Sequence, residues 1–119
     1  MSRSAVPELL SEIVRNADRV IALIDRHELA SDDDARTIRS AILWHFIVIG
    51  EAASRLGEPF HEQHAAIPWR SIIDQRNVIA HGYDAIDWHL LFALRKTALP
   101  NLVAEANNVL KHYPPAAES

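Results

Sequence analysis

The stretch "AILWHFIVIGEAA", residues 41–53, decides the fold because it is apolar on nearly every face of a helix. It belongs to a predicted helix from about Asp33 to Leu56, which ends at Gly57 with Pro59 behind it. A helix that is apolar all round is buried on all sides. Because a small bundle cannot easily surround one helix, we expect part of this helix to contact a second chain.

Two residues inside this stretch do not fit a simple buried helix. Gly50 costs roughly 1 kcal/mol of helix propensity relative to alanine, which the close approach of another helix would explain. Glu51 is a carboxylate in the least polar part of the helix, and a buried charge requires a partner. Either Glu51 orients a catalytic side chain, Arg76 or His81, or it forms a structural ion pair or a hydrogen bond at a dimer interface. The structural role is the simpler interpretation, and both hypotheses stay open at this point.

The rest of the chain shows the hydrophobic pattern of further helices and no strand pattern. Apolar residues at a spacing of three and four over residues 10–24 predict a long amphipathic helix. A short helical turn is expected within residues 58–67. A further helix is predicted from about Pro68, at a first helical position, to Ala80, and Gly82 terminates it.

The last predicted helix begins near Asp87, a plausible N-cap, and continues to Leu110. Pro100 is expected to kink this helix rather than end it, because the apolar period resumes after it. The fold class is therefore all-α: an antiparallel bundle of four to five helices. It forms one domain over residues 1–119, with a core of about 8–112 and a frayed tail at 113–119.

The composition limits the kinds of site and partner that fit this chain. The chain has 119 residues, no cysteine and a formal net charge of −4, so disulfides and thiolate metal sites are excluded. The start of the chain lacks the long apolar core of a signal peptide, and we expect a cytoplasmic protein with no membrane span. With an acidic balance, nucleic-acid binding requires a local basic patch, which Arg70, Arg76, Arg95 and Lys96 could supply.

Two patterns resemble metal sites only weakly. In "ASDDDA", residues 30–35, consecutive carboxylates point in different directions, so Ser31 or an early aspartate capping the long helix is the better interpretation. His61 and His64 are three residues apart, one short of the usual H-E-x-x-H spacing, and no third ligand is visible. We interpret them as exposed polar residues of a short helix, and we expect no metal and no cofactor.

The stretch "RNVIAHGYD", residues 76–84, carries the residues best suited to chemistry. Asn77 and His81 are four residues apart and share one face of a helix, so Asn77 could fix which imidazole nitrogen faces outward. Arg76 can hold a phosphate bidentately and His81 can exchange a proton near neutral pH. Because RNA supplies its own nucleophile, the 2′-hydroxyl, this pair suits metal-independent RNA cleavage. The alternative is a surface histidine and Tyr83 flanking a helix end, with Arg76 paired to a nearby aspartate: Asp74, Asp84 or Asp87.

The spacing Arg76, four residues, His81, one residue, Tyr83 resembles the R-x4-H-x-Y signature of HepT-like proteins in the HEPN superfamily. The stretches "IGEAA" (49–53), "IPWRSI" (67–72) and "LPNL" (99–102) also resemble that family and occur in the same order. The similarity extends to about His112.

This resemblance implies a helical bundle that forms a homodimer and brings an arginine and a histidine from each protomer into one cleft. It implies the toxin of a type VII toxin–antitoxin system, an endoribonuclease whose RNA substrate is a tRNA or an mRNA. The implied antitoxin is a minimal nucleotidyltransferase that transfers AMP from ATP to Tyr83.

The hypothesis that follows is specific: His81 acts as general base or acid, Arg76 stabilises the pentavalent phosphate, and Asn77 orients the reacting side chains. Glu51 supports them only under the first of its two interpretations above. The products would be a 2′,3′-cyclic phosphate and a 5′-hydroxyl. The alternative is a non-catalytic helical module that docks on the nucleotidyltransferase without cutting RNA.

Overall fold

The computed structural model describes residues 5–113, apart from the side chain of Tyr83. Its elements are α1 (Ala5–His27), α2 (Asp32–Leu56), α3 (Glu58–Gln63), α4 (Trp69–His81), the 3-10 helix η1 (Tyr83–Ala85), α5 (Trp88–Ala93) and α6 (Ala98–Leu110). Within residues 5–113 there is no strand, so the all-α fold class is confirmed. The expected tail lies outside these residues, except for Tyr113.

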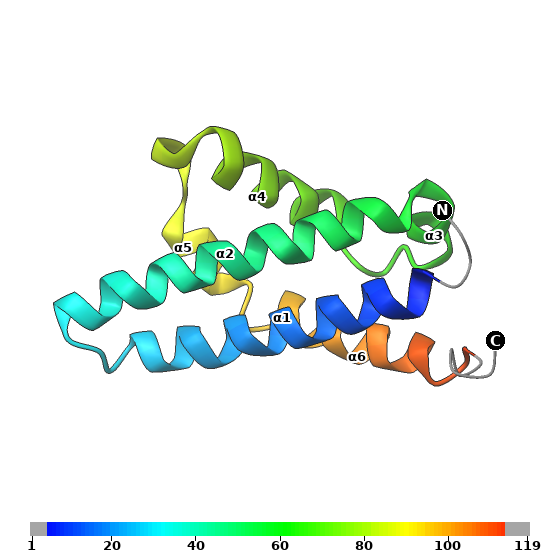
Figure 1. Ribbon diagram of the computed structural model, residues 1–119, viewed down its shortest axis with the longest axis horizontal. Helices are drawn as coiled ribbons and strands as arrows, with labels where there is room; N and C mark the ends of the chain where they lie inside the picture. The colour runs from blue at the N-terminus through cyan, green and yellow to red at the C-terminus, as the bar shows by residue number, and fades with distance from the viewer. Residues whose placement is uncertain (1–4, 114–119) are drawn as a thin grey trace.

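The four longer helices pack side by side in the order α4, α2, α1, α6 (Figure 1). Successive neighbours in this order run in opposite directions, which gives an elongated bundle with extents of 48 × 25 × 22 Å. α2 therefore has α1 on one side and α4 on the other. Over the described residues, no helix is long and apolar enough to span a bilayer.

Local signals set both ends of α2 as predicted. The hydroxyl of Ser31 accepts a hydrogen bond from the backbone N–H of Asp34 at 3.3 Å, and aspartates fill the first turn. At the other end, Gly57 has φ of 89°, a left-handed conformation that glycine adopts without strain, and its N–H donates to the carbonyl of Ser54. The cap interpretation of "ASDDDA" is thus confirmed.

The core lies between α1, α2, α4 and α6, and it consists of aliphatic side chains around Phe46. Its largest fully buried members are Val20, Leu10, Ile13, Ile42, Ile49, Leu91, Leu99 and Leu102. These residues recur at helical spacing on the inward faces, which explains why the hydrophobic period located the helices correctly.

The prediction of one continuous helix at the end of the chain is wrong, because the structure has two helices there. α5 ends at Ala93, a turn covers residues 94–97, and α6 starts at Ala98, so Pro100 does not kink a continuous helix. Pro100 lies in the first turn of α6, where backbone N–H groups have no partner within the helix and a missing donor costs nothing. This break makes six α-helices in residues 5–113 where four to five were expected.

The expectation that His61 and His64 are exposed polar residues is also wrong. The Nε2 atom of His61 lies 2.7 Å from the carbonyl oxygen of Ala53, and its ring stacks on Trp69 with centroids 4.7 Å apart. His64 packs against Phe60, and its backbone carbonyl accepts from the indole N–H of Trp69. Both residues are half-buried. Their contacts hold the short helix α3 against the bundle.

A partly buried histidine joins α1 to α2. The amide nitrogen of Asn16 donates to the carbonyl of Glu12, so its Oδ1 atom faces His45 as an acceptor. The Nδ1 atom of His45 therefore donates to this oxygen at 2.7 Å. Burial lowers the pKa of His45, and the positive charge of Arg19 lowers it further. The folded protein therefore favours the neutral ring more than the unfolded chain does.

This histidine makes stability depend on pH. Below the unfolded pKa of about 6.5, the unfolded chain binds a proton that folded His45 resists, so the free energy of unfolding should fall as the pH drops through this range. Urea unfolding at pH 8 and pH 5.5 should show a smaller pH-dependent loss in His45→Gln than in the wild type. The exposed His89→Gln is the matched control and should keep the wild-type loss. An unchanged pH dependence in His45→Gln would contradict this assignment.

Candidate active site where α2 crosses α4

α2 and α4 approach each other closely where Gly50 faces Arg76. A Cβ added to Gly50 would overlap the Cβ atom of Arg76 and lie 2.7 Å from its Cγ and 3.6 Å from its Cα. The expectation that another helix approaches Gly50 is thus confirmed, and that helix is α4 of the same chain. Only glycine leaves the space that the stem of Arg76 fills.

The guanidinium of Arg76 is held by two neighbours. Its Nη2 atom forms an ion pair with the carboxylate of Glu51, the residue after Gly50, and its Nη1 donates to Oδ1 of Asn77 at 2.9 Å. Its Nε is shielded from solvent and has no hydrogen-bond partner among the described side chains. Two different nitrogens are thus fixed from two different helices, which sets the plane of the guanidinium.

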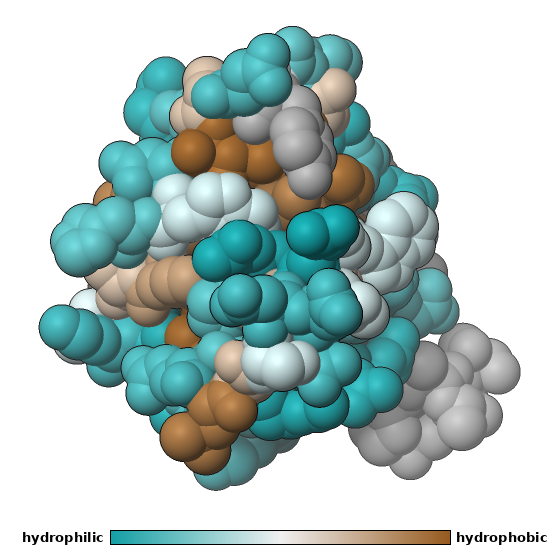
Figure 2. Space-filling model, turned by 90° about the vertical axis from the view of Figure 1, so that its left-hand side faces the viewer, coloured by the Kyte–Doolittle hydropathy of each residue, from teal (hydrophilic) through white to brown (hydrophobic). Residues whose placement is uncertain are grey.

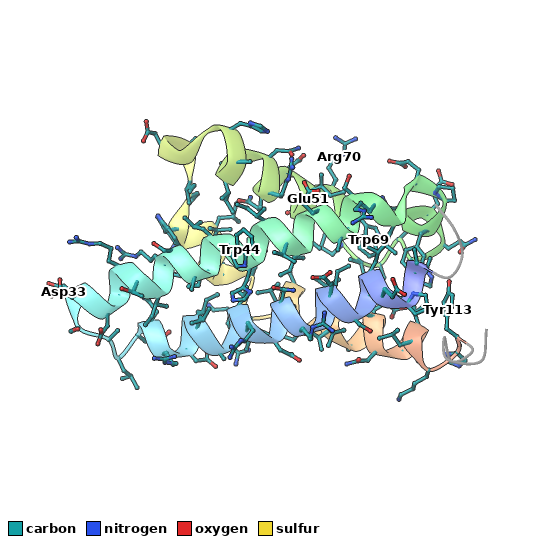
Figure 3. All side chains as sticks on the ribbon, viewed as in Figure 1. Asp33, Trp44, Glu51, Trp69, Arg70 and Tyr113 are labelled. Carbon is teal, nitrogen blue, oxygen red and sulfur yellow. The ribbon has the colours of Figure 1, made fainter. Side chains whose placement is uncertain are left out.

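The environment of Glu51 differs from the one expected from the sequence. Its side chain is 49% exposed and that of Arg76 is 29% exposed, so the ion pair lies at the edge of the helix crossing and not in the core. The expectation of a buried carboxylate is wrong because α1 and α4 cover the two apolar sides of α2 and leave this edge open. Figure 3 shows Glu51 on α2, on the side of α4. The partner of Arg76 is Glu51, in place of the aspartates expected from the local sequence.

His81 is the last residue of α4, and it is exposed. α4 ends as predicted at Gly82, whose N–H donates to the carbonyl of Val78 at 2.7 Å. His81 is five residues after Arg76, which is about 7.5 Å along the helix axis. Within the described part of the chain, no hydrogen bond joins His81 to Asn77. Asn77 instead accepts a hydrogen bond from Arg76. It therefore orients the arginine, whereas the sequence suggested that it orients the histidine.

We call Glu51, Arg76, Asn77 and His81 the α2–α4 site. The structure brings Glu51 and Asn77 into direct contact with Arg76 and places His81 about 1.4 turns further along α4. The backbone of Tyr83 begins η1 directly after this helix, and its side chain lies outside the described residues. The role expected for Tyr83 therefore stays a prediction.

The α2–α4 site has the groups needed to bind a phosphate. Each terminal nitrogen of a guanidinium carries two N–H donors, so Nη1 and Nη2 of Arg76 each retain one after bonding Asn77 and Glu51. A phosphate that arrives here competes with the half-exposed carboxylate of Glu51. His81, exposed at the end of the same helix, carries an imidazole that can accept or donate a proton.

The other basic residues considered from the sequence occupy two separate hollows. Arg70 lines a hollow of about 330 Å³ together with Glu58 and Asp74. Arg95 and Lys96 line another of about 320 Å³, with acidic neighbours of their own, Asp25 and Glu28. Neither hollow is a purely basic patch.

Arg95 is engaged by one of these acids. Its Nε and Nη2 donate to the two carboxylate oxygens of Asp25 at 2.9 and 3.0 Å. These hydrogen bonds hold the pKa of Asp25 below its ordinary value and raise that of Arg95. Across the residues that the structure covers, no three His, Cys, Asp or Glu side chains gather closely enough to hold a metal ion.

One exposed aromatic side chain on α2 was not predicted from the sequence. Trp44 is 62% exposed, whereas Trp69 is 5% exposed. Trp44 precedes Glu51 by seven residues, so the two share a face of α2 about 10 Å apart along the axis (Figure 3). A helical projection of α2 could have found this pair, because a seven-residue spacing returns to the same side.

The end of the molecule where α4 finishes is mostly hydrophilic, with an apolar area just below the top of the view (Figure 2). The exposed large hydrophobic side chains of the described residues are Leu29, Trp44 and Leu90. Of these, Trp44 is on the helix that supplies Glu51, and Leu90 is on α5, which follows the site in the chain.

Comparison with known proteins gives consistent results. The model of the family described as Ribonuclease HepT-like matches residues 10–109. The chain is 30% identical over 112 residues to "Putative RNase MJ1380" of Methanocaldococcus jannaschii, which covers 92% of this chain and 100% of that protein. It is 28% identical over 71 residues to "Probable ribonuclease HepT" of Thermococcus cleftensis, covering 60% and 64% of the two chains. No solved structure matches the chain significantly.

The family match covers all four residues of the α2–α4 site and both helices that position them. It confirms the resemblance drawn from the R-x4-H-x-Y spacing and the stretches around it. The chain belongs to the Ribonuclease HepT-like family of the HEPN superfamily.

Proposed function

We propose that this protein is the ribonuclease toxin of a type VII toxin–antitoxin system and that it cleaves RNA at the α2–α4 site. The observation that carries the proposal is the fixed guanidinium of Arg76, which retains free donors and lies on the same helix as the exposed His81. Membership of a ribonuclease family supports the same chemistry.

The reaction needs a phosphate clamp and two proton transfers. The RNA 2′-oxygen attacks the adjacent phosphorus as a general base removes its proton. The bond from phosphorus to the 5′-oxygen then breaks, and a general acid protonates that oxygen. The products are a 2′,3′-cyclic phosphate and a 5′-hydroxyl. Arg76 binds the non-bridging oxygens and stabilises the charge that develops on the pentavalent phosphate, so the proposal assigns no metal ion.

One α2–α4 site supplies one histidine, whereas the reaction uses both a base and an acid. A second copy of the chain would supply the other proton-transfer group, His81 of the partner subunit. A homodimer that joins the same surface of two chains places two such sites about one two-fold axis. We therefore propose that the active site is composite and lies at the dimer interface.

Trp44 supports this arrangement. A large aromatic side chain with most of its surface in water is a typical anchor of a protein interface. Ile47 and Val48, close to it on α2, are only partly buried in the single chain. Because Trp44 shares a face of α2 with Glu51, an interface centred on it brings the partner subunit close to the guanidinium of Arg76.

The proposed regulation acts on Tyr83. A minimal nucleotidyltransferase would transfer AMP from ATP: the tyrosine oxygen attacks the α-phosphorus, loses its proton and displaces pyrophosphate. The backbone of Tyr83 follows His81 by two residues. AMP attached there adds bulk and negative charge beside Arg76 and His81, which would exclude and repel an RNA phosphate.

RNA cleavage tests the catalytic assignment. The purified protein should cleave RNA in the presence of EDTA and leave 2′,3′-cyclic phosphate ends. Arg76→Ala and His81→Ala should each lower the rate at least ~100-fold, because each removes a group that acts on the transition state. The controls Arg15→Ala and His112→Ala, at exposed positions outside the site, should cleave at the wild-type rate.

Two outcomes would contradict the assignment. If Arg76→Ala and His81→Ala both cleave like the wild type, the catalytic residues lie elsewhere. If the wild type binds the nucleotidyltransferase but cuts no RNA, the non-catalytic docking module is the correct interpretation.

The oligomeric state tests the interface. Trp44→Glu should convert the dimer to a monomer in sedimentation equilibrium and abolish RNA cleavage, since it places a charge in an apolar contact. Leu29→Glu is the matched control, because Leu29 is 92% exposed and lies in the α1–α2 connection. A Trp44→Glu variant that stays dimeric would place the interface on another face.

AMP transfer tests the switch. With the cognate nucleotidyltransferase and ATP labelled at the α-phosphorus, the wild type should take up label and lose RNA cleavage. Tyr83→Phe should take up none and keep its activity, whereas Tyr113→Phe, which changes the other tyrosine of the chain, should behave like the wild type. Labelling of Tyr83→Phe would show that another residue is modified.

A further inference from the structure

We propose that Gly50 is a positioning residue for Arg76: the space left by its missing side chain sets the path of the arginine stem and hence the place of the guanidinium. This inference rests on the proposed ribonuclease function, because it concerns the group assigned to the phosphate. Gly50 itself touches no substrate.

The contact involves the part of Arg76 that cannot move independently. A Cβ at residue 50 would overlap the Cβ of Arg76 and crowd its Cγ at 2.7 Å. These atoms lie next to the α4 backbone, so a change of rotamer at the far end of the side chain cannot relieve the overlap. α4 must therefore shift relative to α2, and the stem of Arg76 shifts with it.

The two ends of the Arg76 side chain are fixed by consecutive residues of α2. Gly50 accommodates the stem, and Glu51 forms the ion pair with Nη2 at the tip. Asn77 of α4 binds Nη1, and the shielded Nε shows that the middle of the side chain is enclosed. A displaced stem therefore removes the guanidinium from both of its partners.

Gly82, the other glycine near the site, shows how much space an added Cβ has at a position without a close contact. A Cβ added to Gly82 would approach nothing closer than 3.6 Å, the carbonyl oxygen of Val78. Gly50, by contrast, lies inside a long helix, where glycine weakens helix formation relative to alanine. The space that this glycine leaves is filled by the stem of Arg76.

The first experiment compares Gly50→Ala with the wild type by RNA cleavage and by NMR of the arginine Nε–H groups. The cleavage rate should fall at least ~100-fold, to the level of Arg76→Ala. The circular dichroism spectrum should remain helical, and the Arg76 Nε–H signal should shift as its enclosed position is lost. Gly82→Ala serves as the control for helicity and for the NMR signal only.

A second variant separates collision with Arg76 from collision with the α4 backbone. Gly50→Ala should lower the thermal unfolding midpoint of the wild type, but it should not lower that of Arg76→Gly, which lacks the stem. If Gly50→Ala destabilises Arg76→Gly as much as the wild type, the glycine serves the packing of the two backbones, and the positioning role is wrong.

The outcomes for Gly50 and for the ribonuclease function are distinguishable. A folded Gly50→Ala that cleaves RNA at the wild-type rate overturns the positioning role and leaves the ribonuclease intact. If the wild type itself cuts no RNA, the proposed function fails, and the Nε–H signal and the double variant still decide whether Gly50 places Arg76.

Discussion

The contact between Gly50 and the stem of Arg76 is the constraint on which the rest of the site depends. It lets α4 lie close against α2, and that approach brings the guanidinium to Glu51, while Asn77 binds it from α4 itself. Because α4 is a continuous helix from Trp69 to His81, fixing Arg76 on α2 also fixes the end of the helix where His81 projects into solvent. The core of α1, α2 and α6 supplies the rigid surface against which this geometry is held.

Charge at the site is balanced, and this reconciles an acidic chain with a proposed RNA substrate. The net charge of −4 and the acids beside Arg70 and Arg95 give the chain little general attraction for nucleic acid. Arg76 is itself paired with Glu51, so a phosphate at the proposed site would have to replace or share that partner. RNA binding would then depend on shape and on a second subunit more than on long-range attraction.

The sequence predicted the fold well because its signals are local. Hydrophobic spacing located α1, α2 and α4, and Ser31, Gly57 and Gly82 marked helix ends where the structure has them. The break at residues 94–97 was missed, since that turn contains neither glycine nor proline. The pairing of Glu51 with Arg76 and the exposure of Glu51 depend on how two helices cross, which periodicity does not encode. The role of Tyr83 came from family resemblance alone.

The most direct test of the account is a crystal structure of the dimer with an RNA whose 2′-oxygens are methylated and therefore cannot attack. The scissile phosphate is expected within hydrogen-bond distance of the Arg76 guanidinium, with His81 from one or both subunits beside the 2′- and 5′-oxygens. A phosphate bound instead in the hollow beside Arg70 and Trp69, with the α2–α4 site empty of RNA, would contradict it.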